Sequence, residues 1–464
     1  MHRVLGLKLV LLLSLYAKSG AQDLYWIPVS AIDSCQHHLA QVIYCSDWLD
    51  QCVVEINSDE QKTCFETTLP VATFDISGSD RENKLLYSFA LEQIEGSLLV
   101  DRQLTGKDVK IGIIDGGFLK ADRSSSLSHV FKSNKVQYYH DFVTPEMQPY
   151  TGSMALDDGH GTDVWQMIGG FDSTKNIRYG IATDATYYLA RTDHGGFEKR
   201  IEEYLLIDAL EKMHEMGVRL VNISLGYSKE YTDPTENYTP AQMDGKTTML
   251  TRAIDTAFYA KNMIPVVAAG NEGDDPDWRV LNSPADARGA IAVGATKFKI
   301  WDKISYSSIG TPGLDYVKPN ISCFSTQGTS FATPVITGFI AAILQYNPDY
   351  STREIIDLVQ QSGHLYPYGN NYIGYGVPQA SRLLRILDNK RIPRPVTLQV
   401  SSKRVKIGLS EEIGYVVVLH KKGIEVIERQ VQRPRGKNIK IRRVKDATAS
   451  TVLMQQKAVE VIWQ

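Results

Sequence analysis

The 464-residue sequence predicts an α/β protein, with a mostly parallel sheet covered by helices on both faces and a small all-β module after it. From about residue 101, short apolar stretches alternate with stretches whose apolar residues recur at helical spacing, as in strands joined by helices in a parallel sheet. After the proline-containing segment 391–396 the period changes to two residues, which indicates strands alone. With 43% apolar and 22% charged residues, the chain can bury a sizeable core.

The first 21 residues have the pattern of a signal peptide. A positive start at His2-Arg3 is followed by the short apolar run Leu9–Leu15 and by small residues that end at Ala21. We therefore expect cleavage near Ala21 and an exported protein that is secreted, periplasmic or on the cell surface. An N-terminal anchor is the alternative. No later run reaches 18 apolar residues, so no transmembrane segment is expected.

The next segment, residues 22–100, has no strong period and holds four of the five cysteines, Cys35, Cys45, Cys52 and Cys64. Export makes disulfides possible, and two of them stapling this segment are the favoured interpretation, with the pairing open. Free buried thiols come next, and zinc is least favoured because no pair has C-x₂-C spacing. The pair His37-His38 could bind a metal, but a solvated or structural role is favoured.

Residues 101–390 form the predicted α/β domain. Its expected strands are 109–114, 187–190, 219–224, 264–268 and 290–293. Helical spacing from Ile201 to Met216 predicts a helix that Gly217 ends as a C-cap, and a long apolar helix is expected from Val335 to Leu344. Active sites on such sheets lie at the carboxyl ends of the strands.

Residues 391–464 form the predicted basic β-rich module, with strands expected at 397–400, 404–407, 415–419 and 439–441. Residues 390–464 hold 17 Lys and Arg against 6 Asp and Glu, a charge of +11, whereas the other 389 residues hold 33 against 47, a charge of −14. The overall charge of −3 argues against a dedicated nucleic-acid-binding protein. The module could contact an acidic surface, serve in sorting, or be a solvated structural cap.

Three polar residues lie where the sheet places chemistry. Asp115 ends the strand 109–114 and is followed by two glycines, His160 precedes a predicted helix, and Ser330 precedes the long apolar helix. A serine hydroxyl needs a base within hydrogen-bond reach to act as a nucleophile. A histidine can take that proton and return it to the leaving group, and an aspartate fixes the histidine tautomer.

A fourth polar residue, Asn271, follows the strand 264–268. Its side-chain amide could donate to an oxyanion together with the backbone N–H of Ser330. The loss of such a donor costs roughly 2.7–4 kcal/mol, a magnitude measured in subtilisin.

The order Asp, His, Ser and the sequences around these residues resemble the subtilisin-like serine proteases (subtilases, peptidase family S8). The matching stretches are Ile113–Gly117, His160–Thr162, Ala269–Gly273 and Gly328–Pro334, with weaker matches at Asn222–Gly226 and Ala290–Ala295. The resemblance covers about residues 101–385. It implies a secreted serine endopeptidase that cleaves polypeptides through an acyl-enzyme, with Asp115, His160 and Ser330 as the triad and Asn271 as the oxyanion donor.

The resemblance also implies the walls of the primary specificity pocket. Ser224, Leu225 and Gly226 would form one wall, and Ala268, Ala269 and Gly270 the other. Their small size suggests a roomy apolar pocket. The resemblance makes residues 22–100 either a propeptide that is removed or, given the cysteines, a retained stapled extension.

Three features of the sequence depart from the family pattern. Asp163 replaces a second histidine, Lys318-Pro319-Asn320 replaces Lys-Pro-Asp, and only residues 325–327 separate Phe324 from Gly328. The short loop puts in doubt a metal site or lid in that region.

The chemistry requires no cofactor, and no metal ligands are assigned. The acidic run 274–277 could hold structural Ca²⁺, but a solvated loop is favoured. Cys323 is expected to be a packed apolar residue. A catalytically inactive peptide-binding scaffold of the same fold is the alternative function.

Overall fold

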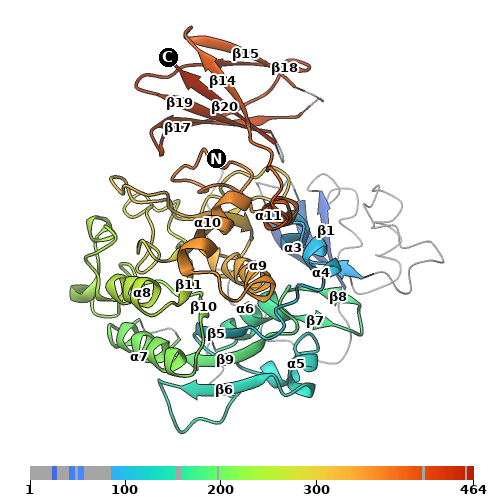
Figure 1. Ribbon diagram of the computed structural model, residues 1–464, viewed down its shortest axis with the longest axis vertical. Helices are drawn as coiled ribbons and strands as arrows, with labels where there is room; N and C mark the ends of the chain where they lie inside the picture. Colours follow the sequence, from blue (N-terminus) through green and yellow to red (C-terminus); the bar gives the residue numbers. More distant parts are fainter. Residues whose placement is uncertain are drawn as a thin grey trace, which may run out of the picture. The chain divides into compact units, whose positions relative to one another are not determined.

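The computed structural model describes residues 23–28, 41–46, 51–56, 85–152, 158–195, 198–409, 413–454 and 457–464 (Figure 1). The chain divides into two compact units, Met1–Lys84 and Leu85–Gln464. The predicted signal peptide at residues 1–21, Cys35, Cys64 and the pair His37-His38 lie outside the described residues.

The smaller unit contains three antiparallel strands in the order β1-β3-β2. They are β1 (Asp23–Pro28), β2 (Gln41–Ser46) and β3 (Gln51–Ile56). The backbone register places Cys45 of β2 opposite Cys52 of β3. The two predicted disulfides fall outside the described residues and side chains.

The larger unit is built on a seven-stranded sheet in which every neighbouring pair is parallel, in the order β13-β12-β11-β10-β5-β9-β6. The predicted α/β class is therefore confirmed. The strands are β5 (Lys110–Asp115), β6 (Val136–Asp141), β9 (Thr186–Arg191), β10 (Leu220–Ile223), β11 (Ile264–Ala268), β12 (Ile291–Thr296) and β13 (Ile321–Phe324).

Successive residues of the central strands pack into two separate cores, one on each face of the sheet. In β5, Ile113 belongs to the first core and Ile114 to the second. Helices α6 (His160–Gly169), α9 (Thr333–Tyr346), α10 (Thr352–Ser362) and α11 (Ala380–Leu387) pack on the first core. Helices α7 (Ile201–Glu215) and α8 (Met249–Ala260) pack on the second.

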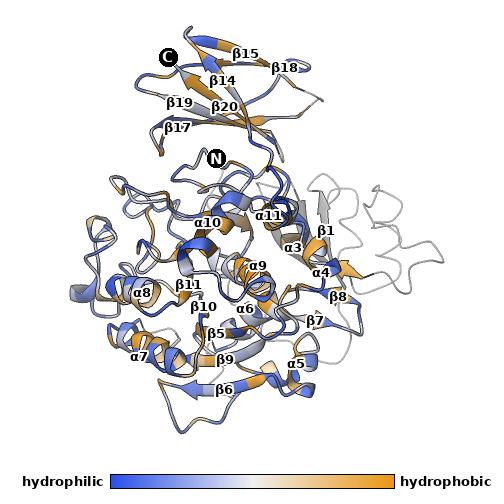
Figure 2. Cartoon of the chain, viewed as in Figure 1, coloured by the Kyte–Doolittle hydropathy of each residue, from blue (hydrophilic) through white to orange (hydrophobic). Residues whose placement is uncertain are grey.

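Helix α9 is the central helix of the first core. Its residues from Thr333 to Leu344 are all buried, and Figure 2 shows it as a hydrophobic element. The segment Thr329–Tyr346 is the one helical stretch among the described residues that is long and apolar enough to cross a membrane by length and composition. Its burial identifies it as a core helix, and Ser330 lies in the 3₁₀ turn Thr329–Phe331 just before α9.

Residues 85–100, which were expected to belong to the N-terminal segment 22–100, pack within the larger unit. They form β4 (Leu86–Tyr87), α3 (Phe89–Gln93) and α4 (Ser97–Asp101). Leu91, Ile94 and Leu99 are fully buried in the first core. Gln93 donates to Thr296 Oγ1 at 3.2 Å and accepts from the backbone N–H of Phe324 at 2.6 Å, which ties α3 to two strands of the sheet.

The remaining short elements connect these layers. They are the 3₁₀ helices η1 (Ala121–Arg123), η2 (Pro234–Glu236), η3 (Pro240–Gln242) and η4 (Thr329–Phe331), the helix α5 (Ser128–Lys132), and the strands β7 (Phe171–Asp172) and β8 (Ile177–Arg178).

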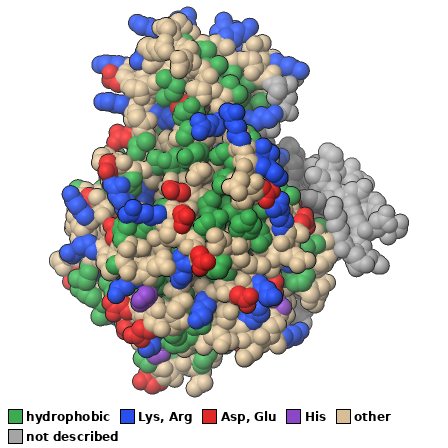
Figure 3. All heavy atoms as spheres, viewed as in Figure 1, with side chains coloured by type: hydrophobic (Ala, Val, Ile, Leu, Met, Phe, Trp, Pro, Cys, Tyr) green, Lys and Arg blue, Asp and Glu red, His purple; other side chains and the backbone are tan. Residues whose placement is uncertain are grey.

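In its described residues, the C-terminal module forms strands and no helix, as predicted. A five-stranded sheet in the order β14-β20-β19-β16-β17 accompanies the pair β15-β18. The strands are β14 (Val396–Val400), β15 (Arg404–Gly408), β16 (Val416–Lys422), β17 (Glu425–Gln432), β18 (Asn438–Arg442), β19 (Ala449–Met454) and β20 (Lys457–Trp463). Lys and Arg side chains are prominent on its visible face (Figure 3).

Strand β16 joins this module to the α/β domain. Val416 and Val418 face the core of the module, whereas Val417 and Leu419 share a small hydrophobic cluster with residues of the α/β domain, including Leu365. Polar contacts add to it, since Arg429 pairs with the buried Asp302 at 2.5 Å and Asn371 accepts from the N–H of Val426 at 2.8 Å. The module is therefore packed against the α/β domain and not attached by the linker alone.

Candidate active site

Asp115, His160 and Ser330 meet at the carboxyl edge of the sheet. Asp115 is fully buried at the end of β5, and its Oδ1 lies 2.6 Å from Nδ1 of His160 at the first residue of α6. The rings of His160 and Phe331, the residue after Ser330, lie 5.3 Å apart. His160 and Ser330 line the same cavity, so strands and helices far apart in sequence bring the predicted acid, base and nucleophile together.

Ser330 is held by a buried polar network. The hydroxyl of Ser330 donates to the carbonyl of Ser224 at 3.1 Å, and the hydroxyl of Ser224 donates to the carbonyl of Ser330 at 2.9 Å. Asn222 donates to Ser224 Oγ at 2.9 Å and accepts from Thr337 of α9 at 2.8 Å. This chain of bonds fixes the turn that carries Ser330 against the end of β10.

Asn271 is oriented by Thr329. The backbone N–H and the hydroxyl of Thr329 donate to Oδ1 of Asn271 at 2.8 and 3.1 Å. With its carbonyl oxygen occupied, Asn271 turns its NH₂ group away from Thr329. Asn271 and Ser330 line the same cavity, as an oxyanion donor must.

Arg191 at the end of β9 was not predicted from the sequence. Its buried guanidinium donates to the carbonyl of Gly116 at 2.9 Å, to Asp141 at 3.0 Å and to Asp158 at 3.4 Å. It thereby links the turn after Asp115 to the turn before His160. The available signal was a lone charged residue that ends an apolar strand at the carboxyl edge of the sheet.

The cavity beside Ser330 has a volume of about 260 Å³. Five of the six predicted wall residues line it: Ser224, Leu225, Gly226, Ala268 and Gly270. Ala269 lies elsewhere, fully buried in the second core. Four carboxylates share the lining, on Asp193, Glu198, Glu230 and Glu272, so the cavity is more acidic than the small wall residues suggested.

The departures from the family pattern lie in different parts of the α/β domain. Asp163 accepts a hydrogen bond from Gln166 at 3.0 Å on α6. Lys318 is buried, is followed by a cis peptide bond to Pro319, and donates to the carbonyl of Ala290 and to Asn320 Oδ1. In the acidic run 274–277, Asp275 pairs with Lys229 at 2.6 Å. Cys323 is a free, fully buried thiol, as expected for a packed residue.

Comparison with known proteins identifies the family. Residues 106–376, more than half of the chain, match the subtilase family of peptidases. The chain belongs to the subtilase family. Subtilisin NAT of Bacillus subtilis subsp. natto is 27% identical over 302 residues, which cover 61% of this chain and 69% of that protein. Subtilisin DY of Bacillus licheniformis is 27% identical over 281 residues, which cover 58% and 89%.

Among solved structures, MycP1 from Mycobacterium smegmatis is similar with a TM-score of 0.49 and 21% identity, covering 68% of this chain and 87% of that one. Family membership and the parallel α/β fold support a serine protease.

Proposed function

We propose that this subtilase is an active endopeptidase with Asp115, His160 and Ser330 as its triad and Asn271 as its oxyanion donor. The observation that carries the proposal is the 2.6 Å contact between Asp115 and His160 at the cavity that also holds Ser330. Polypeptides are the proposed substrates.

The proposed reaction begins with proton transfer from Ser330. Its hydroxyl has one proton, which must leave the Ser224 carbonyl before His160 Nε2 can accept it. As Oγ attacks the substrate carbonyl carbon, Asp115 stabilises the imidazolium through Nδ1–H. The oxyanion accepts from Asn271 Nδ2 and the Ser330 N–H.

Collapse of the tetrahedral intermediate breaks the peptide bond. His160 returns the proton to the leaving amine, and an acyl-enzyme on Ser330 remains. Water then gives its proton to His160 and attacks the ester carbon. The C–O bond to Ser330 breaks, and Oγ regains its proton from His160.

The test is covalent labelling by a fluorophosphonate probe and hydrolysis of casein. The wild-type protein should be labelled and active, and Ser330→Ala should lose labelling and at least about 10⁴-fold in kcat. A wild-type protein that is not labelled, or is no faster than Ser330→Ala, would support an inactive peptide-binding scaffold instead.

We also propose that the protein is exported, with residues 1–21 as its signal peptide, residues 22–100 as an extension or propeptide with disulfides, residues 101–390 as the peptidase domain and residues 391–464 as a basic module. The N-terminal sequence of the secreted form tests the first two assignments, since it reads both cleavage sites directly. Deletion after residue 390 tests the module. Unchanged secretion together with unchanged activity would eliminate both a sorting and a stabilising role.

A further inference from the structure

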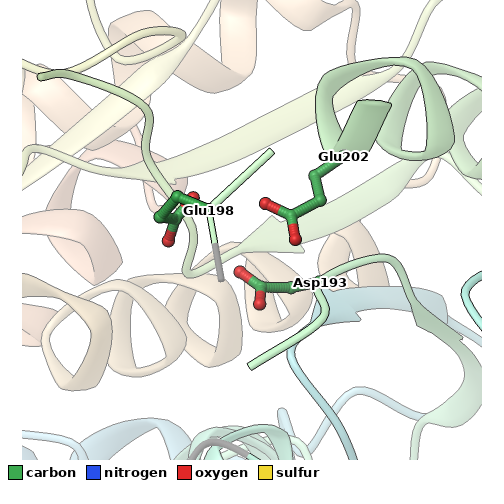
Figure 4. A group of neighbouring side chains, drawn as sticks. All are labelled: Asp193, Glu198 and Glu202. Atoms are coloured by element: carbon green, nitrogen blue, oxygen red, sulfur yellow. The ribbon is translucent and has the colours of Figure 1, made fainter. Parts of the chain in front are cut away.

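Two of the four carboxylates that line the active-site cavity belong to a cluster with a third, Glu202. Oxygen atoms of Asp193, Glu198 and Glu202 all lie within 4.8 Å of one another (Figure 4). Asp193 and Glu198 line the cavity beside Ser330, and Glu230 and Glu272 line it as well. Of the described residues that line this cavity, none is Lys or Arg.

Three neighbouring basic residues form ion pairs with carboxylates outside this cluster. Arg191 pairs with Asp141 and Asp158, Arg200 pairs with Glu203 at 2.8 Å, and Lys229 pairs with Asp275 at 2.6 Å. Burial and the neighbouring carboxylates of Asp193 and Glu202 raise the pKa of Glu198. A cation bound beside Glu198 would favour its charged form, so the crowded carboxylates suit a basic group on a ligand.

Tyr227 is a second, independent observation. Its side chain lines the cavity but is only 2% exposed, and its hydroxyl has no hydrogen-bond partner among the described residues. Burial, followed by the charges of Asp193, Glu202 and Glu198, raises the pKa of this hydroxyl. Buried polar groups normally have a hydrogen-bond partner, and a donor group on a bound ligand would supply one to this hydroxyl.

A ligand with several N–H donors fits this arrangement better than a metal ion does. Glu202 already accepts from the N–H and Nδ1 of His194 at 2.9 and 2.7 Å and from the N–H of Lys199 at 3.1 Å. Its oxygens are thus used by protein donors, while Glu230 and Glu272 extend the acidic lining beyond the three clustered carboxylates. An ammonium or guanidinium group on a bound peptide would meet this lining next to the nucleophile.

We propose that this acidic pocket, lined by Asp193, Glu198 and Tyr227 with Glu202 in the same carboxylate cluster, selects a peptide that carries a Lys or Arg side chain shortly before the bond that Ser330 attacks. The inference rests on the proposed endopeptidase function and names its substrate class. Selection of this kind comes from charge complementarity with a desolvated partner.

The test uses internally quenched peptides that carry one Arg at each of the four positions before the scissile bond. Each is matched by a peptide with citrulline, the neutral isostere of Arg, at the same position. We expect wild-type kcat/KM to be roughly 10- to 100-fold higher for at least one Arg peptide than for its citrulline match. Glu198→Gln should bring the ratio of kcat/KM for the Arg peptide to that for its citrulline match down to within roughly threefold of one.

Two further variants sharpen the result. Tyr227→Phe removes only the unpartnered hydroxyl and should reduce the preference less than Glu198→Gln. Glu211→Gln removes an exposed carboxylate of α7 and should leave the preference unchanged.

Three outcomes would overturn the proposal in distinguishable ways. If the fluorophosphonate labels the protein and both peptides are cleaved equally, substrate selection by the pocket is wrong and the protease function stands. If no label is incorporated, the protease function itself fails. If millimolar Ca²⁺ restores both peptides equally after chelation, and Glu198→Gln abolishes that response, the carboxylates form a cation site instead.

Discussion

Asn271 shows how one residue can be oriented by its neighbour for a chemical task. Because Thr329 occupies its carbonyl oxygen, the amide orientation is set before a substrate arrives. We predict that Asn271→Ala lowers kcat by about 10²–10³-fold with little change in KM. Asn271→Asp keeps the acceptor for Thr329 but loses the donor, so steady-state kinetics should show at least the same loss. Near-normal kcat in the aspartate variant would refute the donor role.

Arg191 is the residue whose loss should affect both stability and activity. Replacing it by Met leaves Asp141 and Asp158 without their shared buried cation and frees the Gly116 carbonyl. We expect the free energy of unfolding to fall by about 3–5 kcal/mol. Denaturant unfolding in a Ser330→Ala background measures it without self-cleavage. The control Arg252→Met replaces an exposed residue on α8 and should change the free energy of unfolding by at most about 0.5 kcal/mol. An equally small effect of Arg191→Met would show that Arg191 does not hold the two turns together.

These residues also show which parts of the candidate site could be predicted from the sequence. Asp115, His160, Ser330 and Asn271 could be predicted because each stands at a strand end or helix start that local pattern reveals. Arg191 could not, because its partners Asp141 and Asp158 come from distant segments and are known only once the sheet is assembled. Glu198 could not, because local pattern does not show that it lines the same cavity as Ser330. The same limit explains why small wall residues suggested an apolar pocket when carboxylates from neighbouring loops line it.

At the scale of elements, helix α10 begins with a capping box. Ser351 Oγ accepts from the N–H of Glu354 at 3.3 Å, and Glu354 Oε2 accepts from the N–H of Ser351 at 2.8 Å. We predict that Ser351→Ala lowers the free energy of unfolding by about 1 kcal/mol because an N-terminal donor of the helix loses its acceptor. Glu354→Gln keeps both bonds and is the matched control in denaturant titrations. Equal effects of the two variants would argue against the capping role.

Elements were predictable where hydrophobic pattern alone defines them. The buried strands β5, β9, β10 and β11 and helices α7 and α9 lie within a few residues of their expected positions, since nearly every inward residue is apolar. Strand β17 was missed because its exposed face interrupts the pattern with charged and amide side chains. Strand β13 is four residues long and contains Ser322 and Cys323, too short a pattern to stand out.

At the scale of the whole molecule, a buried histidine should shape the response to acid. His364 accepts a hydrogen bond from the N–H of Val377 at 2.8 Å and packs against Trp301. Burial lowers the pKa of His364 to about 3, from an ordinary value of 6.5. Between these values the unfolded chain binds one more proton at this site, so stability must fall as the pH falls from 6.5 toward 3.

We predict that His364→Gln makes the unfolding free energy less dependent on pH in that window, by up to about 1.4 kcal/mol per pH unit. Denaturant unfolding at several pH values, again with Ser330→Ala, gives the slopes. The exposed His214→Gln serves as control and should keep the wild-type slope. Parallel slopes for wild type and His364→Gln would show that His364 does not set the acid response.

The opposite net charges of residues 390–464 and of the rest of the chain also matter at the scale of the whole molecule. The basic module does not stand apart, since β16 shares a hydrophobic cluster with Ile300, Leu365 and Ile373, and Arg429 pairs with Asp302. Its charge therefore contributes directly to the electrostatic field of a largely acidic domain.

The strand order of the module has a consequence for biosynthesis. β14 is the first strand after the linker, yet its neighbour in the five-stranded sheet is β20, the last strand of that sheet along the chain. The ribosome synthesises β14 well before β20. By the time β20 is made, every strand of the seven-stranded sheet has emerged, together with Asp115, His160 and Ser330. Domains generally fold in the order in which they are made. A nascent chain thus has the means to assemble its active site before the module that follows can close.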